Sequence, residues 1–246
     1  MKIQIENLKN SFGEKVAVDI DQYEIRDGEM RGLGGTTGAG KSTLFRLMLD
    51  LVKADGGRVL MHPSEEEQSQ GIARGSVDVA HTEDWKDWTG AFVDESFLID
   101  YLTPDEYFQF IGRISGRKQE EVDTFLQDFE QFMAGEVAGQ KKLIRNLSAG
   151  NKQKVGSVGA MLLQPKVLIL DEPFNFLDPS SQSAIKRLLL EYNRKTGATI
   201  LVSSHNLQHT VDICPRIALL EHGVIIRDID NTDRQAATEL ENYFEV

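Results

Sequence analysis

The sequence predicts an α/β fold with a largely parallel sheet and an inserted helical segment. Apolar runs of strand length, such as Val167–Leu170 and Thr199–Ser203, alternate with helical stretches, which is typical of a parallel sheet. The N-terminal residues instead alternate between polar and apolar, and residues 103–132 show only helical periodicity. These observations place an N-terminal strand region and a helical insert beside an α/β core.

Composition excludes several classes of protein. The chain has 246 residues, of which 40% are hydrophobic and 27% charged, as in globular proteins. Its net charge of −12 argues against a nucleic-acid partner, because phosphate contacts need a basic surface. The single cysteine, Cys214, excludes an internal disulfide. Since we find no secretory signal and no membrane-spanning run, we expect a cytoplasmic protein that reaches a membrane only through a partner.

The first part of the chain predicts three strands and a helix. Residues Lys2–Leu8 alternate as in a half-buried strand, and Val16–Ile25 gives a second strand region. The short stretch Met30–Gly34 leads through glycines into a helix over Lys41–Leu51. The polar, glutamate-rich residues Pro63–Gly75 are expected to form a solvated loop.

Two amphipathic helices are expected in the middle of the chain. The first begins at Thr103, where Pro104 follows the cap and Glu106 completes a capping box. The second carries apolar residues at helical spacing from Val122 to Phe132. Together they form a helical insert of about 45 residues.

Strands and helices alternate again from Val167 onward. A helix is expected over Ser180–Lys195, between the strands Val167–Leu170 and Thr199–Ser203. Two further strands, Ile217–Leu220 and Val224–Ile229, are expected to close the sheet.

A glycine-rich turn between a strand and a helix predicts a phosphate-binding loop. Residues 35–42 read GTTGAGKS and satisfy the pattern G-x-x-x-x-G-K-[ST]. The glycines let backbone N–H groups converge on phosphates, and the following helix adds its positive dipole end. Lys41 is expected to reach the β- and γ-phosphates, and Ser42 to ligate Mg²⁺. The alternative, a plain glycine-rich turn, is disfavoured by the flanking strand and helix.

Two carboxylates follow the apolar strand VLIL, where open α/β sheets bind ligands. Asp171 is placed to hold Mg²⁺, and Glu172 is placed to polarise a water molecule as general base. The alternative is a strand that ends in a solvated acidic turn. The phosphate-binding loop elsewhere in the chain favours the catalytic interpretation.

Two further segments carry polar residues suited to an anion. Ser148 and Gly150 begin a helix with two lysines, which is either a capped helix alone or an anion site at its N-terminus. His205 follows the strand Thr199–Ser203 and is a candidate contact for the γ-phosphate, although a lone histidine is usually structural.

These motifs together resemble the ATP-binding-cassette (ABC) family, specifically the ATPase subunit of an exporter-type ABC transporter. GTTGAGKST is similar to the Walker A motif, VLILDEP to Walker B and LSAGN to the signature usually written LSGGQ. FNFLDP is similar to the D-loop, and SSH to the switch histidine. The signature distinguishes this family from other P-loop ATPases.

The resemblance implies a P-loop NTPase core with a mixed sheet, antiparallel strands in its N-terminal part and an inserted α-helical subdomain. The chain would form a single ATPase domain. Its core lobe would span about residues 1–94 and 161–229, its helical lobe about 95–160, and a short tail 230–246.

The resemblance also implies ATP and Mg²⁺ as cofactors and a head-to-tail dimer, with a second copy of the chain as the expected partner. Each ATP would lie between the Walker motifs of one subunit and Ser148 and Gly150 of the other, with Asp178 coupling the two sites. The catalytic residues implied are Lys41, Glu172 and His205, and the metal ligands are Ser42, Asp171 and Asp94. The other implied nucleotide contacts are Phe12, stacked on adenine, and the loop residues Gly35, Thr36, Thr37, Gly38, Ala39, Gly40 and Thr43.

The chain departs from the family pattern at several positions. Ala149 replaces the first glycine of the signature and Asn151 its terminal glutamine, while the serine and the second glycine remain. Asp94, followed by Glu95, stands where the family's Q-loop should offer a glutamine. An acidic residue there can still reach Mg²⁺ or water.

The resemblance implies integral membrane permease subunits as partners, docked in a groove near Asp94 and Phe97 and holding the chain at the inner face of the cell membrane. The aromatic residues in this region either line that groove or form the core of the helical lobe: Phe97, Tyr101, Tyr107 and Phe108. The acidic Q-loop and the short C-terminus after Ile229 favour export.

Two other functions stay open at this point. One is a soluble ABC ATPase that acts without a permease. The other is a nucleotide-dependent scaffold that does not hydrolyse ATP. The intact residues Lys41, Asp171, Glu172 and His205 argue against the scaffold.

Overall fold

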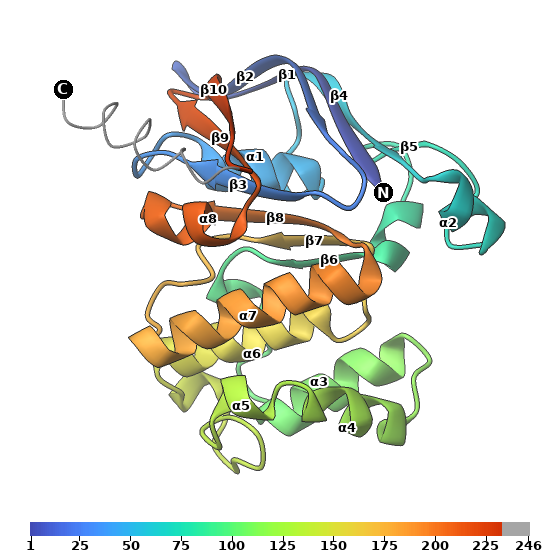
Figure 1. The fold of residues 1–246 in the computed structure, drawn as a ribbon, viewed down its shortest axis with the longest axis vertical. Coiled ribbons are helices and arrows are strands. Elements are labelled where there is room, and N and C mark those ends of the chain that lie inside the picture. The colour runs from blue at the N-terminus through green and yellow to red at the C-terminus, as the bar shows by residue number, and fades with distance from the viewer. Residues whose placement is uncertain (233–246) are drawn as a thin grey trace.

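The computed structural model describes residues 1–232, so the predicted tail 230–246 lies, from residue 233 on, outside the described residues. The described chain contains two β-sheets stacked above a group of helices (Figure 1). Strands and helices alternate around the larger sheet, and the predicted α/β class with antiparallel N-terminal strands is confirmed.

The smaller sheet is antiparallel, with the strand order β2-β1-β4-β5. Strand β1 continues to Phe12, past the predicted end at Leu8, because it bulges at Asn10 and Ser11 and stays paired with β2. The bounds of these strands are β1 Lys2–Phe12, β2 Lys15–Ile25, β4 Gly56–His62 and β5 Val77–Asp78.

The larger sheet has the order β10-β9-β3-β8-β7-β6, and all its pairs are parallel except β9 with β10. Gly34 pairs with Ser204, and Leu170 pairs with both Val202 and Phe92, so β3, β8, β7 and β6 end at one edge. The strand bounds are β3 Met30–Gly34, β6 Thr89–Phe92, β7 Val167–Leu170, β8 Thr199–Ser204, β9 Arg216–Glu221 and β10 Val224–Asp230.

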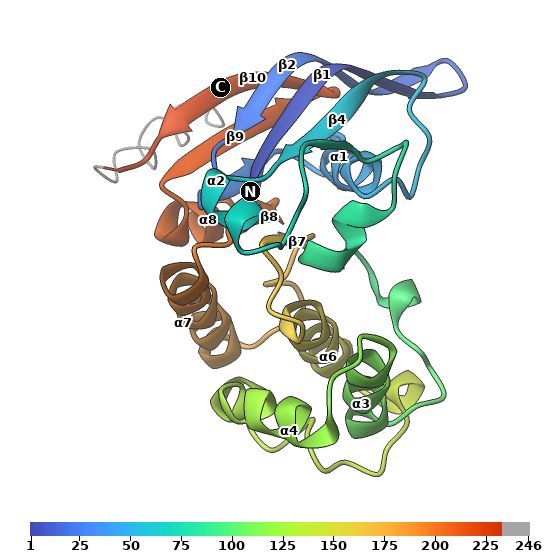
Figure 2. The same cartoon turned by 90° about the vertical axis from the view of Figure 1, so that its right-hand side faces the viewer.

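Helices cover both faces of the larger sheet (Figure 2). Helix α1 (Lys41–Met48) packs in a core shared with the smaller sheet, where Phe45 meets Ile5 and Ile169 in one buried cluster. The opposite face is covered by α6 (Ala149–Met161), α7 (Pro179–Thr196) and α8 (Leu207–Ile213). The sheet is therefore buried on both faces, as its continuous apolar strands require.

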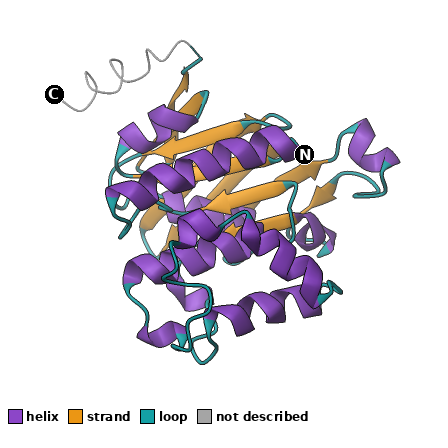
Figure 3. Cartoon of the chain, turned by 60° about the horizontal axis from the view of Figure 1, so that its bottom comes forward, coloured by secondary structure: helices purple, strands orange, loops and turns teal. Residues whose placement is uncertain are grey.

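Residues 95–166 contain helices and turns but no strand, and they form the helical part of the chain (Figure 3). Helix α3 (Pro104–Ile114) begins at the predicted Thr103 capping box, which is confirmed. The single helix expected over Val122–Phe132 is wrong, because the chain forms α4 (Gln119–Gln127) and then α5 (Glu130–Met133). The break lets Phe129 and Phe132 both enter the core, where each is at most 3% exposed.

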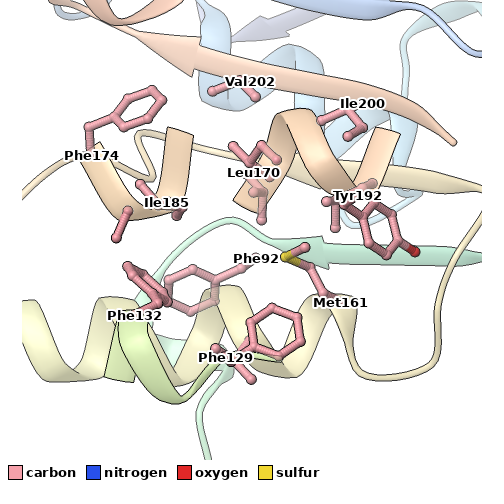
Figure 4. Packing of buried hydrophobic residues seen from close by; sticks show 14 of the residues in the cluster. Phe92, Phe129, Phe132, Met161, Leu170, Phe174, Ile185, Tyr192, Ile200 and Val202 are labelled. Atoms are coloured by element: carbon pink, nitrogen blue, oxygen red, sulfur yellow. The ribbon is translucent and has the colours of Figure 1, made fainter. Parts of the chain in front are cut away.

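The core below the larger sheet joins the helical segment to the strands (Figure 4). Phe92 of β6 and Leu170 of β7 pack with Phe129 and Phe132, and α7 contributes Ile185. Burial of this many large side chains makes the helical segment part of one continuous core, and truncating such a phenylalanine typically costs about 3–5 kcal/mol.

The expected solvated loop over Pro63–Gly75 is wrong in one part, because it contains the short helix α2 (Glu65–Ser69). Ser64 and Glu67 form a reciprocal capping box, and Glu67 is buried with its Oε1 atom 3.0 Å from the amino group of Met1. Acidic residues in a first helical turn are stabilised by the helix dipole, so a run of glutamates need not be a loop.

Of the aromatic residues near the predicted docking groove, some are exposed, as a groove requires, and others belong to the core of the helical segment. Phe97 and Tyr101 are 47% and 72% exposed, whereas Phe108 is completely buried and Tyr107 packs against the core from α3. Helical periodicity placed Phe108 correctly on the buried face of α3, but Ile114, which the same spacing places on that face, is 68% exposed at the end of the helix.

Candidate functional site

The P-loop runs from the end of β3 to the start of α1, and the backbone of two neighbouring strands packs against it. A Cβ atom at Gly35 would lie 2.4 Å from the carbonyl oxygen of Leu220, and one at Gly40 would lie 2.4 Å from that of Ala17. Both glycines also have positive φ angles, 150° and 109°, so only glycine fits. The loop backbone therefore keeps its curved form through close contact with β9 and β2.

Lys41 is buried at the first turn of α1 and lies over the loop. Its Nζ atom donates hydrogen bonds to the carbonyl oxygens of Gly35 at 2.8 Å and Thr36 at 3.2 Å. The same atom lies 3.6 Å from Oε1 of Glu172. The remaining predicted loop contacts differ in exposure: Thr36, Thr37 and Gly38 are exposed, Ala39 is buried, and Ser42 and Thr43 are partly buried.

Asp171 stands directly after β7, whose four residues are fully buried. Its backbone N–H donates to Phe92 in β6, its carboxylate accepts a hydrogen bond from the Ser203 hydroxyl, and the Ser42 hydroxyl lies near enough to that carboxylate to affect its pKa. Burial raises the pKa of Asp171, and the two hydroxyls oppose this effect. The structure thus brings together Ser42 and Asp171, two of the three residues predicted to hold Mg²⁺.

Glu172 has a φ angle of 49°, which is unfavourable for a residue with a side chain. Its backbone N–H donates to Oγ of Ser203 at 2.8 Å. Its carboxylate Oε2 accepts from the backbone N–H of His205 at 3.2 Å and lies 2.9 Å from that histidine's Nδ1. The strained backbone is therefore held by contacts to β8 and the residue that follows it, and these contacts fix the carboxylate.

Sequence reasoning missed Ser203. Its hydroxyl donates to Asp171 and accepts from the backbone of Glu172, so it joins both carboxylate residues to β8. The motif Ser203-Ser204-His205 contains the signal, since alternate residues of a strand point to the same face as the histidine that follows.

Ser148 caps helix α6 and is exposed. Its Oγ atom accepts a hydrogen bond from the backbone N–H of Asn151 at 3.2 Å, so the replacement of the family's glutamine leaves the cap intact. A Cβ atom at Gly150 would lie 2.6 Å from the carbonyl oxygen of Phe176. Gly150 therefore lets the signature segment pack against the D-loop of the same chain.

Asp178 caps helix α7. Its carboxylate accepts hydrogen bonds from the backbone N–H groups of Ser180 at 2.9 Å and Ser181 at 3.0 Å, and from both hydroxyls. These hydrogen bonds hold the pKa of Asp178 far below its usual range. Phe176, two residues earlier, is 74% exposed with a φ angle of 63°.

Asp94 lies at the start of the 3₁₀ helix η2 (Glu95–Phe97). Its carboxylate accepts a hydrogen bond from the backbone N–H of Ser96 and pairs with Arg46 of α1 at 2.8 Å. Burial opposes ionisation, but these contacts outweigh it and lower the pKa of Asp94. The residue predicted as a metal ligand is thus already paired with a cation.

A cleft of about 240 Å³ connects these segments. Its lining comes from the Q-loop, the start of α6, the end of β7 and the D-loop: Val93, Asp94, Glu95, Ala149, Lys152, Gln153, Asp171, Glu172, Asn175 and Phe176. Asp94 therefore shares a cleft with Asp171 and Glu172, while Phe12, 58% exposed at the end of β1, is not part of its lining.

Two features of residues 1–232 bear on the type of site. No group of three or more His, Cys, Asp or Glu side chains there is arranged to hold a metal ion by itself. No helix in that range is long and apolar enough to cross a membrane.

Comparisons with known proteins agree with this arrangement. The family model described as ABC transporter matches residues 18–175. The chain is 30% identical over 243 residues to the uncharacterized ABC transporter ATP-binding protein YhcH of Bacillus subtilis, covering 98% of this chain and 74% of that protein. It is also 30% identical to the methionine import ATP-binding protein MetN of Carboxydothermus hydrogenoformans, covering 94% and 67%.

Solved structures show the same fold. A structure described as the ATP binding subunit of an ABC transporter superposes with a TM-score of 0.77 at 24% identity, covering 98% of this chain and 94% of that one. A dimeric bacterial ABC transporter cassette also gives 0.77, at 22% identity, covering 93% and 98%. Since the family model covers more than half of the chain, and a relative that is 30% identical is covered over 74% of its length, the chain belongs to the ABC transporter family of ATP-binding proteins.

Proposed function

We propose that this chain binds ATP with Mg²⁺, hydrolyses the ATP, and thereby powers a membrane transporter. The observation that carries the proposal is the meeting of Lys41, Asp171 and Glu172 at one edge of the larger sheet. A P-loop lysine, a buried carboxylate beside a serine hydroxyl, and a carboxylate fixed by a histidine are the parts that phosphoryl transfer to water requires.

The residues present fit Mg²⁺. This ion is usually held by one or two protein oxygens together with substrate phosphates, so a larger cluster of acidic residues is not required. The Ser42 hydroxyl, in the first turn of α1 after the P-loop, lies near enough to the Asp171 carboxylate to lower its pKa. Bound by these two groups, the ion would neutralise charge on the phosphates.

Glu172 is the general base in this proposal. His205 contacts its Oε2 atom and fixes the carboxylate, so Oε1 takes the proton of the water that attacks the γ-phosphate. The water oxygen forms a bond to phosphorus as the bond to ADP breaks, giving ADP and inorganic phosphate. Lys41 exchanges its loop carbonyl partners for phosphate oxygens when the nucleotide binds.

The active form is a head-to-tail homodimer in this proposal. Support comes from Ser148 and Phe176, which are exposed at the N-terminus of α6 and on the D-loop rather than packed inside the chain. Ser148 and Gly150 of one subunit would contact the γ-phosphate held by the P-loop of the other, and Asp178 would link the two sites. An anion between two helix N-termini favours this closure, because each terminus carries partial positive charge.

The partner proposed for the outer surface is a membrane permease subunit, which would place the chain at the inner face of the cell membrane. Phe97 and Tyr101 support this, because both expose large aromatic surface, and Phe97 lies in η2 directly after the cleft residues Asp94 and Glu95. Export is the proposed direction, supported by the acidic pair Asp94-Glu95 at the Q-loop. Uptake of candidate substrates into inverted membrane vesicles with ATP, and none without it, would agree with export.

The partner is tested by purifying the tagged chain from detergent-solubilised membranes and identifying bound proteins by mass spectrometry. We expect a multi-span membrane protein that is lost with Phe97→Ser. The matched control is Leu190→Ser on α7, since Leu190 is 44% exposed and Phe97 is 47% exposed. Retention of the membrane protein by Phe97→Ser would exclude this docking surface. Recovery of soluble partners alone, with ATPase activity intact, would support the permease-free alternative.

A further inference from the structure

Two neighbouring carboxylates form ion pairs with two different helices. Oδ2 of Asp94 lies 2.8 Å from Nη2 of Arg46 on α1, and Oε2 of Glu95 lies 2.9 Å from Nζ of Lys152 on α6. Both acidic residues follow the end of β6, with one residue between that strand and Asp94. A single short segment thus contacts the P-loop helix with one side chain and the signature helix with the next.

Each of the two cations lies one helical turn beyond a serine of the candidate site. Arg46 is four residues after Ser42 on α1. Lys152 is four residues after Ser148, and its backbone N–H donates to the Ser148 carbonyl at 3.0 Å. Residues four apart lie on the same helix face, so each ion pair acts on the face that carries a site serine.

The segment between the two ion pairs is itself fixed. Asp94 accepts a hydrogen bond from the backbone N–H of Ser96 at 2.8 Å, which caps η2 and sets the direction of Glu95. On the other side, the Phe92 carbonyl of β6 accepts from the backbone N–H of Asp171 at 2.9 Å. The side chains of Asp94 and Glu95 therefore extend from a short segment that is attached, through β6, to the edge of the sheet that carries Asp171.

The two ion pairs are weak enough to affect the position of α6 relative to α1 without contributing much to the stability of the fold. Arg46 and Asp94 are 37% and 35% exposed, and Lys152 and Glu95 are 21% and 63% exposed. Ion pairs this exposed are weak and are screened by salt. Breaking one should leave the core intact while allowing α6 to shift relative to α1.

We propose that Arg46 and Lys152 are positioning residues that act through Asp94 and Glu95. The two ion pairs form an electrostatic brace that sets the placement of the signature helix relative to the P-loop helix. The brace rests on the proposed ATPase function, because it orients Ser148 for the partner's nucleotide while Ser42 serves the chain's own.

The test compares Glu95→Lys, Lys152→Glu and the charge swap that combines both, each in the full chain. One readout is ATP hydrolysis, separated into kcat and KM. The second is the distance distribution between spin labels at Lys53→Cys, which follows α1, and Lys142→Cys, which precedes α6. Both label positions are exposed, whereas the native Cys214 is fully buried, with its pKa raised to about 12 by that burial, and escapes labelling.

We expect each single variant to lower kcat roughly threefold to tenfold, with KM for ATP changed less than about twofold because the P-loop is untouched. The single variants should also broaden the distance distribution, and the swap should restore both kcat and the parent width. The control is Lys86→Glu, which breaks an ion pair to Glu83 at 3.0 Å, and neither of these residues belongs to α1 or α6. It should change neither readout.

Two results would overturn the brace: single variants that match the control, or a swap that fails to restore the parent behaviour. If the parent chain hydrolyses no ATP, the proposed function fails, but the distance distributions still decide whether the brace exists. Raising the ionic strength provides an internal check, since it should move the parent toward the single variants.

Discussion

The candidate site has two regions that are held in different ways. At the edge of the larger sheet, Lys41, Asp171 and Glu172 contact one another or share Ser203, and buried strands carry them. At the N-termini of α6 and α7, the side chains of Ser148 and Asp178 make hydrogen bonds, within residues 1–232, to the first turns of their own helices. The first region is assembled within one chain, whereas the second presents capped helix ends outward.

This difference has a physical basis. Strands buried on both faces fix the residues at their ends, and Val167–Leu170 has no exposed surface at all. A helix cap also fixes a side chain. The N-termini of these two helices, however, point their partial positive charge and their N–H groups that lack an intrahelical partner away from the core. The strand edge is therefore suited to catalysis, and the helix ends are suited to a ligand presented by another molecule.

The largest effect is expected at the strand edge. Glu172→Gln keeps an oxygen that accepts from His205 but cannot take a proton, so kcat for ATP hydrolysis should fall by roughly 10²–10⁴-fold. Binding of ATP should persist, because Lys41 and the loop are unchanged. Phosphate release and equilibrium nucleotide binding measure the two effects separately.

The counterpart is Lys41→Ala, which should lose affinity for ATP instead. Hydrolysis at the parent rate by Glu172→Gln would remove the glutamate from its proposed role. Normal ATP binding by Lys41→Ala would contradict the proposed phosphate-binding role of the P-loop. The comparison between the two regions would then fail as well.

An intermediate effect is expected at the helix ends. Ser148→Asp keeps a good N-cap for α6, so thermal stability should be close to that of the parent. Its carboxylate would repel the γ-phosphate of the partner subunit, so ATP-dependent dimers and hydrolysis should be lost by roughly tenfold or more. Light scattering with ATP in the Glu172→Gln background measures dimer formation.

Ser148→Ala is the matched variant for that experiment. It removes the cap, which costs about 1 kcal/mol, without adding charge. If Ser148→Asp dimerises and hydrolyses as well as the parent, Ser148 is only a helix cap, and the outward-facing region loses its proposed role.

The smallest effect is one of stability at the strand edge. Because burial raises the pKa of Asp171 in the folded state, its protonated form contributes stability below about pH 4 that is lost as the pH rises through the raised value. Asp171→Asn removes a buried charge close to Glu172, so at pH 7 the nucleotide-free variant should melt about 2–4 °C higher. Melting curves at pH 4 and pH 7 check this.

The gain should shrink at pH 4, where the parent carboxyl is itself becoming neutral. The same variant should lose ATP hydrolysis, because an amide is a poor magnesium ligand. A lower melting temperature at pH 7 would mean that the Asp171 carboxylate stabilises the fold, and that the strand edge is not strained for function.

Much of the strand edge follows from local sequence. The P-loop lies in eight consecutive residues, and Asp171 and Glu172 directly follow an apolar strand, so short patterns locate them. The helical insert and the Thr103 capping box are local in the same way. The single helix expected over Val122–Phe132 failed because periodicity cannot detect a bend that keeps its apolar residues buried.

Local signals and contacts between distant residues determined different features of this protein. The sequence alone determined the α/β class, the family and the residues at the strand edge, because those signals are contiguous and chemically specific. Only the tertiary structure decided that Ser203 joins both carboxylate residues, that Asp94 pairs with Arg46, and that Phe97 is exposed while Phe108 is buried. The physical reason is that a side chain's partner depends on which elements pack together, and hydrophobic periodicity specifies the buried face of an element but not its neighbour.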